Sequence, residues 1–166
     1  LKNIPRGMDI ERLILVSLLN GKNHISALRS IPVNIRRLFV HAYQAFLFNE
    51  SVSSLIEEGQ DIIQCVAEDL CFQLEDECVL GKLCNKIVPA MQLAGYSLRN
   101  REGRFEKEML KLLSNEGLTP KDFYIREMQE LSVEGGFRQL PLLVTDMKYA
   151  QKNEFRFRLP VGAYAT

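Results

Sequence analysis

One stretch decides the fold of this chain: Arg36-Arg37-Leu38-Phe39-Val40-His41-Ala42-Tyr43-Gln44-Ala45-Phe46-Leu47-Phe48-Asn49, called the central stretch below. It sets two arginines, a histidine, a tyrosine, a glutamine and an asparagine in a strongly apolar background. A helix that only filled a core would carry fewer polar groups, because each buried one needs a hydrogen-bond partner. A helix that only faced water would carry fewer large apolar groups. The central stretch is therefore predicted to be an internal helix whose polar side chains are hydrogen-bonded.

Helix start and stop signals flank the central stretch. Asp9 is typical of a capped first helix that ends near Gly21, and Asn23 can cap a short second helix. Pro32 suits the opening turn of a long helix, which would contain the central stretch and end at about Glu58. The first part of the chain is thus predicted to be helical, with one long central helix.

The pattern beyond this helix is mixed. Residues 61–88 carry short apolar runs broken by acidic residues and a glycine, which predicts short strands and turns. Pro89 would confine its own segment to a sheet edge or to irregular structure. Apolar spacing predicts a helix from about Phe105 to Gly117. The run Thr119-Pro120-Lys121-Asp122 predicts the start of a further helix that continues to Leu131.

The end of the chain predicts strands. Residues 137–144 form one candidate strand, and residues 153–159 alternate apolar with charged side chains, which is typical of a half-buried strand. Helices, then mixed elements, then strands indicate the α+β class. We expect a helical N-terminal part with a long central helix, mixed short strands, and C-terminal antiparallel strands.

Composition narrows the function classes. The 166 residues fit one domain, or one domain with a small appendage. The 21 basic and 21 acidic residues balance, so the chain lacks a global electrostatic footprint for nucleic acid, although local basic patches remain open. No apolar run reaches membrane-spanning length, and no signal peptide is visible, so neither a membrane partner nor export is expected.

The four cysteines, Cys65, Cys71, Cys78 and Cys84, are spaced too widely for paired zinc knuckles. Neither histidine lies near them in the sequence. We therefore expect no metal, and four reduced thiols in a cytoplasmic protein.

Familiar catalytic motifs are absent: there is no hydrolase elbow, phosphate-binding loop, dinucleotide fingerprint or zinc-protease helix. His41, Gln44 and Phe48 share one face of the predicted long helix. That face could contact RNA, or its polar groups could bond backbone groups between packed elements. The spacing favours the structural interpretation.

A second candidate site is a cluster of guanidinium and aromatic groups in and beside the loop at 95–103. Arginine matches phosphate geometry, and aromatic rings stack on unpaired bases, so the cluster is the best RNA-contact candidate that the residues themselves offer. A solvated loop is the alternative, and the neutral overall charge keeps it open. The cluster consists of Tyr96, Arg99, Arg101, Arg104 and Phe105.

Three motifs in order resemble one enzyme family. The central stretch is similar to "R-x-x-F-x-H-A-Y-Q-S-x-L-F-N" of the TruD family of tRNA pseudouridine synthases, in its archaeal and eukaryotic branch. Gly136-Phe137-Arg138 resembles the "G-x-R" that precedes a strand in that family, and residues 157–166 resemble its "F-x-L-P-x-G-S-Y-A-T" close. The positions that carry the family pattern are Arg36, His41, Tyr43, Gln44, Asn49 and Arg138.

The resemblance implies an isomerase that converts uridine to pseudouridine in tRNA without a cofactor. The family's aspartate nucleophile lies in a "G-x-K-D" segment upstream of the central stretch, and this segment does not occur here. The resemblance therefore implies a C-terminal piece: residues 1–150 as much of the inserted RNA-cradling domain, and residues 151–166 as one returning strand of the catalytic domain. Such a piece is expected to lack activity alone.

The resemblance also suggests roles for individual residues. The inserted domain would bind tRNA through the basic loop, and the last segment would line the uridine pocket through Phe157, Leu159, Gly162 and Tyr164. The expected partners are tRNA and the remainder of the same polypeptide. Two alternatives stay open: a stand-alone RNA-binding module without catalysis, and a small domain that binds protein.

Overall fold

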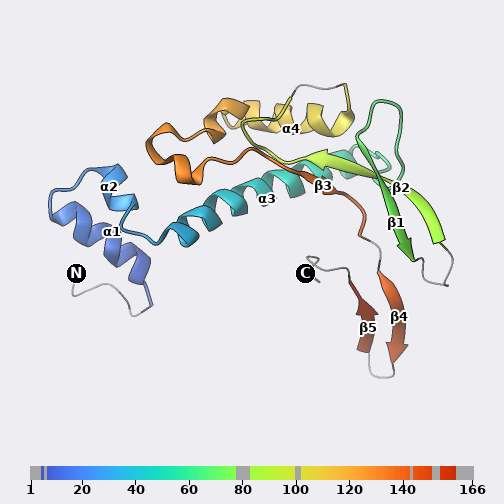
Figure 1. Ribbon diagram of the computed structural model, residues 1–166, viewed down its shortest axis with the longest axis horizontal. Coiled ribbons are helices and arrows are strands. Elements are labelled where there is room, and N and C mark those ends of the chain that lie inside the picture. The colour runs from blue at the N-terminus through green and yellow to red at the C-terminus, as the bar shows by residue number, and fades with distance from the viewer. Residues whose placement is uncertain are drawn as a thin grey trace.

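The long helix predicted from the central stretch is the spine of the molecule (Figure 1). The computed structural model describes residue 5 and residues 7–77, 83–99, 102–142, 144–150 and 154–159, and for residues 74–77, 83–86, 145 and 150 only the backbone. Helix α3 (Val33–Glu57) runs from the small helices α1 (Asp9–Leu19) and α2 (His24–Leu28) at one end toward a sheet at the other.

The boundaries of α1, α2 and α3 follow the local signals with one exception. The Asn23 side chain accepts a 2.8 Å hydrogen bond from the Ser26 backbone N–H, so α2 is capped as predicted. Gly59 turns the chain after α3 at a φ of +78°, a value that glycine adopts without strain. The prediction that Asp9 caps the first helix was wrong: Met8 occupies the cap position, and it makes no side-chain cap bond.

A three-stranded antiparallel sheet lies at the far end of α3, in the order β1–β2–β3. The strands are β1 (Cys71–Glu77), β2 (Leu83–Gln92) and β3 (Phe137–Gln139). The expected strands between residues 61 and 88 are thus present in its second part, and the residues before Cys71 have no regular structure.

Pro89 was expected to keep its segment at a sheet edge, and this was wrong because β2 is the central strand. Its neighbour Ala90 donates to Leu70 O, which places the Pro89 nitrogen on the side that faces β3. The Pro89 carbonyl accepts the Leu140 N–H at 2.9 Å, immediately after β3 ends. The missing N–H therefore falls where the β2–β3 ladder stops, so no strand bond is lost.

The core lies where α3, α4 (Arg104–Asn115) and β2 meet, and Figure 1 shows α4 running alongside α3. Helix α4 has the predicted position and buries one apolar face. The buried apolar side chains of this core are Leu47, Phe48, Leu55, Met91, Ala94, Leu98, Phe105, Met109, Leu113 and Phe123.

The helix predicted from Thr119 to Leu131 is instead two 3₁₀ helices, η1 (Pro120–Phe123) and η2 (Arg126–Leu131). The start signal was right, since the Thr119 N–H and hydroxyl both donate to Asp122 Oδ2 at 2.7 Å. The helix breaks because tertiary bonds take its backbone: the Ile125 N–H donates to Ser132 Oγ, and the Phe123 carbonyl accepts the Val133 N–H.

The C-terminal strands form a separate hairpin of β4 (Thr145–Ala150) and β5 (Glu154–Arg158), which extends away from the main sheet (Figure 1). The strand expected over residues 137–144 is shorter, because Pro141 follows closely on β3. The half-buried strand expected over residues 153–159 was also wrong in burial. Phe155 is 55% exposed and Phe157 is 40% exposed, so β5 has no covered face. Helices and short antiparallel strands nonetheless make the fold α+β, as predicted.

The irregular segment before β1 corrects the cysteine prediction. Cys65 and Cys71 form a disulfide, with their Cα atoms 6.4 Å apart. The expectation of four reduced thiols is therefore wrong for this pair, because the loop turns back and brings the two residues within bonding distance. Cys78 and the Cys84 side chain lie outside what the structure describes.

Candidate nucleic-acid interface

Gln44 and His41 join the middle of α3 to the loop after β2. Gln44 is 5% exposed, and its Nε2 donates a hydrogen bond to the Ala94 carbonyl. His41 Nδ1 lies 3.1 Å from Gln44 Oε1, and Nδ1 carries the proton because an amide oxygen only accepts. These bonds agree with the interpretation in which the polar groups on this face of α3 are hydrogen-bonded between packed elements. The His41 side chain itself remains exposed.

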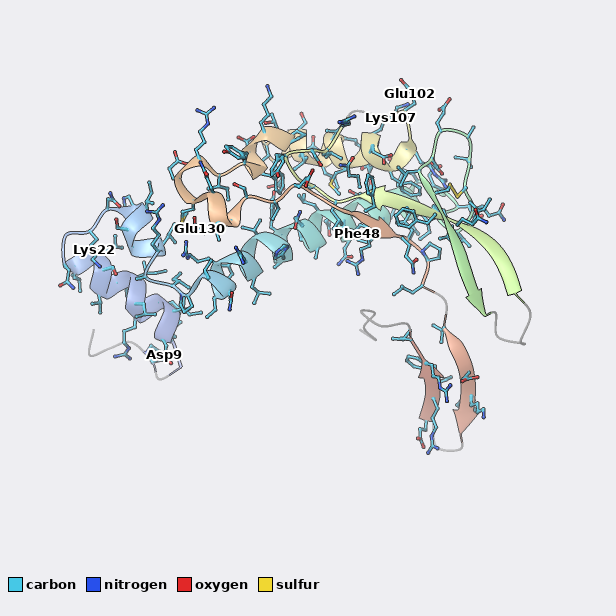
Figure 2. The ribbon with its side chains drawn as sticks, viewed as in Figure 1. Asp9, Lys22, Phe48, Glu102, Lys107 and Glu130 are labelled. Atoms are coloured by element: carbon cyan, nitrogen blue, oxygen red, sulfur yellow. A yellow bond between two sulfur atoms is a disulfide. The ribbon has the colours of Figure 1, made fainter. Side chains whose placement is uncertain are left out.

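The start of α3 is tied to η2 through Glu130, which Figure 2 shows between the two elements. Arg36 Nη1 lies 2.7 Å from Glu130 Oε1, and Arg37 Nε donates to the Glu130 carbonyl at 3.0 Å. The hydrogen bond from Arg36 lowers the pKa of the Glu130 carboxyl. Both arginines of the central stretch thus have structural partners.

A cavity of about 520 Å³ lies between these contacts. Its polar lining comes from α3, from the end of η2 and from the segment that follows η2. The lining includes Arg37, His41, Gln44, Glu130 and Gly135.

The wall of this cavity is held by two crossing backbone segments, residues 93–97 and 133–136. Tyr96 N–H donates to Val133 O at 3.0 Å, and Leu93 N–H donates to Gly136 O at 2.8 Å. The crossing is so close that a Cβ on Gly95 would lie 2.3 Å from Glu134 O. Only glycine fits there, and the two segments that cross in this close backbone contact are called the glycine clamp below.

The structure separates the members of the predicted basic cluster. Arg99 is exposed, and Tyr96 is 43% exposed with its ring edge-on to Tyr124 at 5.9 Å. Arg104 is held inward, since its Nη2 lies 3.0 Å from Asp69 Oδ2 and also donates to the Gln64 carbonyl at 2.8 Å. Arg101 lies outside the described residues. Sequence reasoning missed Asp69, whose position within an irregular segment carried no signal.

The remaining candidate residues are spread over three places. Tyr43 packs near Phe123, and burial, followed by the nearby Glu116 charge, raises the pKa of its hydroxyl. The Arg138 guanidinium lies 4.7 Å from the centre of the Phe48 ring, which Figure 2 labels on α3. Asn49 is exposed on α3.

The predicted pocket-lining residues are only partly described. Phe157 lies on β5 and Leu159 follows it, whereas Gly162 and Tyr164 fall outside the described residues. Within the described ranges, no three His, Cys, Asp or Glu side chains come together to hold a metal ion. Among the helices that the structure describes, none is both long and apolar enough to cross a membrane.

The known proteins that this chain resembles all have the same description. A family model described as tRNA pseudouridine synthase D (TruD) matches residues 1–166. Two archaeal proteins named probable tRNA pseudouridine synthase D align with all of this chain: one from Picrophilus torridus at 30% identity and one from Methanopyrus kandleri at 32%. The chain covers 44% and 40% of these relatives, so it spans less than half of their length.

A solved structure supports the fold. A crystal structure from Methanosarcina mazei, described as tRNA pseudouridine synthase D, matches 99% of this chain with a TM-score of 0.77 at 23% identity. The match covers 44% of that chain. At this level of identity the likeness shows a shared fold.

Proposed function

Because this chain belongs to the TruD family of tRNA pseudouridine synthases, we propose that it is part of an enzyme that isomerises uridine to pseudouridine in tRNA. The observation that carries the proposal is the family match over all 166 residues. The proposed partners are tRNA and the remainder of the same polypeptide. The proposed location is the cytoplasm, and tRNA as the substrate is what supports it. The Cys65–Cys71 disulfide does not support this location, because disulfides are uncommon there.

The proposed chemistry needs a pocket more than it needs many reactive groups. The glycosidic bond from ribose to N1 of uracil breaks, the base turns, and a bond to C5 forms, so the base must stay enclosed while it is detached. The target base must first leave its stack, and exclusion of water protects the separated state. We place the initiating aspartate outside this chain, since no "G-x-K-D" segment occurs in it.

This chain would contribute RNA binding and part of the pocket wall. Residues 1–150 would cradle the tRNA, with Arg99, Arg101 and Arg104 as candidate contacts. Of these, Arg99 has the exposure that a phosphate contact requires, whereas Arg104 is held by Asp69.

The C-terminal hairpin supports the proposal that the rest of the polypeptide covers it. Met147 and Tyr149 on β4 are each 64% exposed, and Phe155 on β5 is 55% exposed. Large apolar side chains in one small hairpin are typical of an interface. Residues 151–166, with Phe157, Leu159, Gly162 and Tyr164, would then line the pocket as a returning strand of the catalytic domain.

The decisive test is turnover by the full-length protein that contains this chain. We expect it to release tritium from tRNA labelled at C5 of uridine, because C5 loses its hydrogen when it bonds to ribose. The proposal would be rejected if the full-length protein is folded but releases no tritium and leaves no pseudouridine in the tRNA.

The arginine candidates need a separate measurement of tRNA affinity. Changing Arg99 and Arg101 together to alanine should weaken tRNA binding and flatten its dependence on salt, because phosphate contacts release counterions. Arg104 is kept in this variant, because it is bound to Asp69 and its loss would also destabilise the fold. Unchanged affinity and unchanged salt dependence would remove these residues from the RNA surface.

A further inference from the structure

The β4–β5 hairpin has two chemically different faces. Tyr149 lies directly opposite Phe155 across the two strands, and their rings are 5.1 Å apart. Lys148 lies directly opposite Arg156. Because side chains alternate along a strand, these two pairs point to opposite faces of the hairpin. One face is therefore aromatic and the other is cationic, on a hairpin that stands apart from the main sheet (Figure 1).

The cationic face carries three basic side chains and one acidic side chain. Alternation along β5 places Glu154, Arg156 and Arg158 together, and the strand register adds Lys148 to the same face. The side chains of Arg156 and Arg158 are 72% and 80% exposed. Lys148 is exposed as well. All three cations are thus accessible to a partner.

Two carboxylates pair with the arginines but do not neutralise this face. Arg156 Nε lies 2.8 Å from Glu154 Oε1. Arg158 Nη1 lies 3.2 Å from Asp146 Oδ2. Ion pairs between exposed side chains contribute little stability, so another anion can displace them. Among the residues that the structure describes, no carboxylate pairs with Lys148, and the face keeps a surplus of positive charge.

The opposed positions of Lys148 and Arg156 need an explanation. Like charges directly opposite each other destabilise a strand pair, and a two-stranded hairpin is marginal in water even without such repulsion. An anion bound between the two side chains would replace this repulsion by attraction. The arrangement is therefore unfavourable for the hairpin alone and favourable for a hairpin that binds a polyanion.

The chemistry of the two faces decides which one protein covers. Burial of the large aromatic side chains is favourable, and such groups are typical of an interface. Burial of the cationic face would remove three charges from water, at a high cost unless each met a carboxylate. When the remainder of the polypeptide covers the aromatic face, as proposed above, the cationic face points away from it.

We propose that the cationic face of the hairpin binds the phosphate backbone of the tRNA. Lys148 and Arg156 hold one phosphate from the two strands, and Arg158 contacts the next one, about 7 Å farther along β5. Contacts of this kind fix the position of the RNA and do not read its bases. The inference rests on the proposed function, because it requires RNA as the ligand, and it adds a contact surface separate from the loop at 95–103.

The test measures the affinity of the full-length protein for a fluorescent tRNA transcript at several salt concentrations. The triple variant changes Lys148, Arg156 and Arg158 to glutamine, which stays polar and removes the charge. It should bind tRNA more weakly at low salt, and its slope of log affinity against log salt should be smaller by about two, one for each lost phosphate contact.

Glu154→Gln changes the same face in the opposite direction. It should bind tRNA more tightly than the wild type at low salt, because the carboxylate no longer competes with phosphate for Arg156. Lys148→Gln should weaken binding. Lys22→Gln is its matched control, because Lys22 is exposed between α1 and α2, at the opposite end of the molecule from the hairpin (Figure 2). It should leave the affinity within twofold of wild type and the slope unchanged.

Thermal unfolding midpoints distinguish an RNA contact from a structural role. A triple variant that unfolds at lower temperature but binds tRNA with unchanged affinity and slope would overturn the surface, because its cations then pair with the remainder of the polypeptide. If the triple variant does not fold, Lys148→Gln and Glu154→Gln decide, since the proposal requires them to shift the affinity in opposite directions.

Two further results would also overturn the surface. The folded triple variant could bind tRNA within twofold of wild type with an unchanged slope, or Lys22→Gln could weaken binding as much as Lys148→Gln does. In each of these cases the wild type still releases tritium from labelled tRNA. Failure of the proposed function looks different, because the wild type then shows no turnover at all.

Discussion

Gln44 is the residue that links the central stretch to the rest of the molecule. Its amide lies in the core, donates to the Ala94 carbonyl, and accepts from His41. A polar group in this position specifies how the loop after β2 sits on α3, because other placements would leave it unpaired.

Replacing Gln44 by leucine should lower the free energy of unfolding by about 1–3 kcal/mol, since the buried Ala94 carbonyl would lose its donor. Denaturant titration of the protein measures this. Gln129→Leu is the matched control, because Gln129 is exposed on η2 and its loss should change stability by less than about 0.5 kcal/mol. Equal effects of the two changes would contradict the assigned role.

The Asp122 carboxylate is expected to make the stability of the fold depend on pH. Hydrogen bonds from the Thr119 hydroxyl and N–H lower the pKa of the Asp122 carboxyl below its ordinary value of 3.8. A lowered pKa in the folded state adds stability that is complete above the unfolded-state pKa and is lost as pH falls through the folded-state value.

The variant Asp122→Asn should therefore be less stable than the wild type at neutral pH, and the difference should shrink as pH falls from about 4 downward. Thermal unfolding at a series of pH values follows both proteins. A stability difference that is constant from neutral to acidic pH would show that the carboxylate charge has no part in the cap.

The glycine clamp between residues 93–97 and 133–136 forms part of the wall of the cavity of about 520 Å³. Gly95→Ala should cost about 3 kcal/mol or abolish folding, because the new Cβ would meet backbone atoms that cannot move aside. Gly136→Ala is the control in the same segment, since a Cβ there has no atom within 4 Å and its φ is not positive. Comparable unfolding midpoints for both variants would refute the close crossing.

Arg104 and Asp69 hold the irregular segment before β1 against α4. The Asp69 side chain is fully buried, and the Arg104 side chain is 14% exposed. Removing one partner of a buried pair strands the other, so Arg104→Met should destabilise the fold by about 3 kcal/mol. Lys107→Met, three residues along the same helix, removes an exposed cation and should have little effect. Denaturant midpoints compare them, and equal values would mean that the pair contributes no stability.

At the scale of the whole molecule, one end of the structure has no core of its own. The β4–β5 hairpin stands apart from the main sheet and exposes large apolar side chains on both strands (Figure 1). A two-stranded hairpin is marginal by itself in water. Its stability is expected to come from the remainder of the protein.

The isolated 166-residue chain is accordingly predicted to release no tritium from C5-labelled tRNA, whereas the full-length protein is predicted to release it. The reason is chemical as well as structural: under the proposed function the initiating aspartate lies outside this chain, and the remainder of the polypeptide completes the pocket wall. A parallel assay at equal protein concentration checks this. Turnover by the isolated chain at a rate near that of the full-length protein would refute the placement of the catalytic group.

The sequence by itself determined the elements whose signals are local. Apolar spacing along α3 and α4, the Asn23 cap and the Thr119–Asp122 start all depend on residues within a few positions of each other, so they could be predicted one segment at a time. The polar groups of the central stretch also predicted hydrogen-bond partners for this helix, although not which residues supply them.

Only the tertiary structure decided the rest, because it depends on contacts between residues far apart in the chain. The ladder that ends at Pro89, the bonds that split η1 from η2, and the pairing of Arg104 with Asp69 all join distant segments. The pairing of Gln92 with Phe137 across β2 and β3 belongs to the same class, because neither residue shows in its own segment which residue it will face.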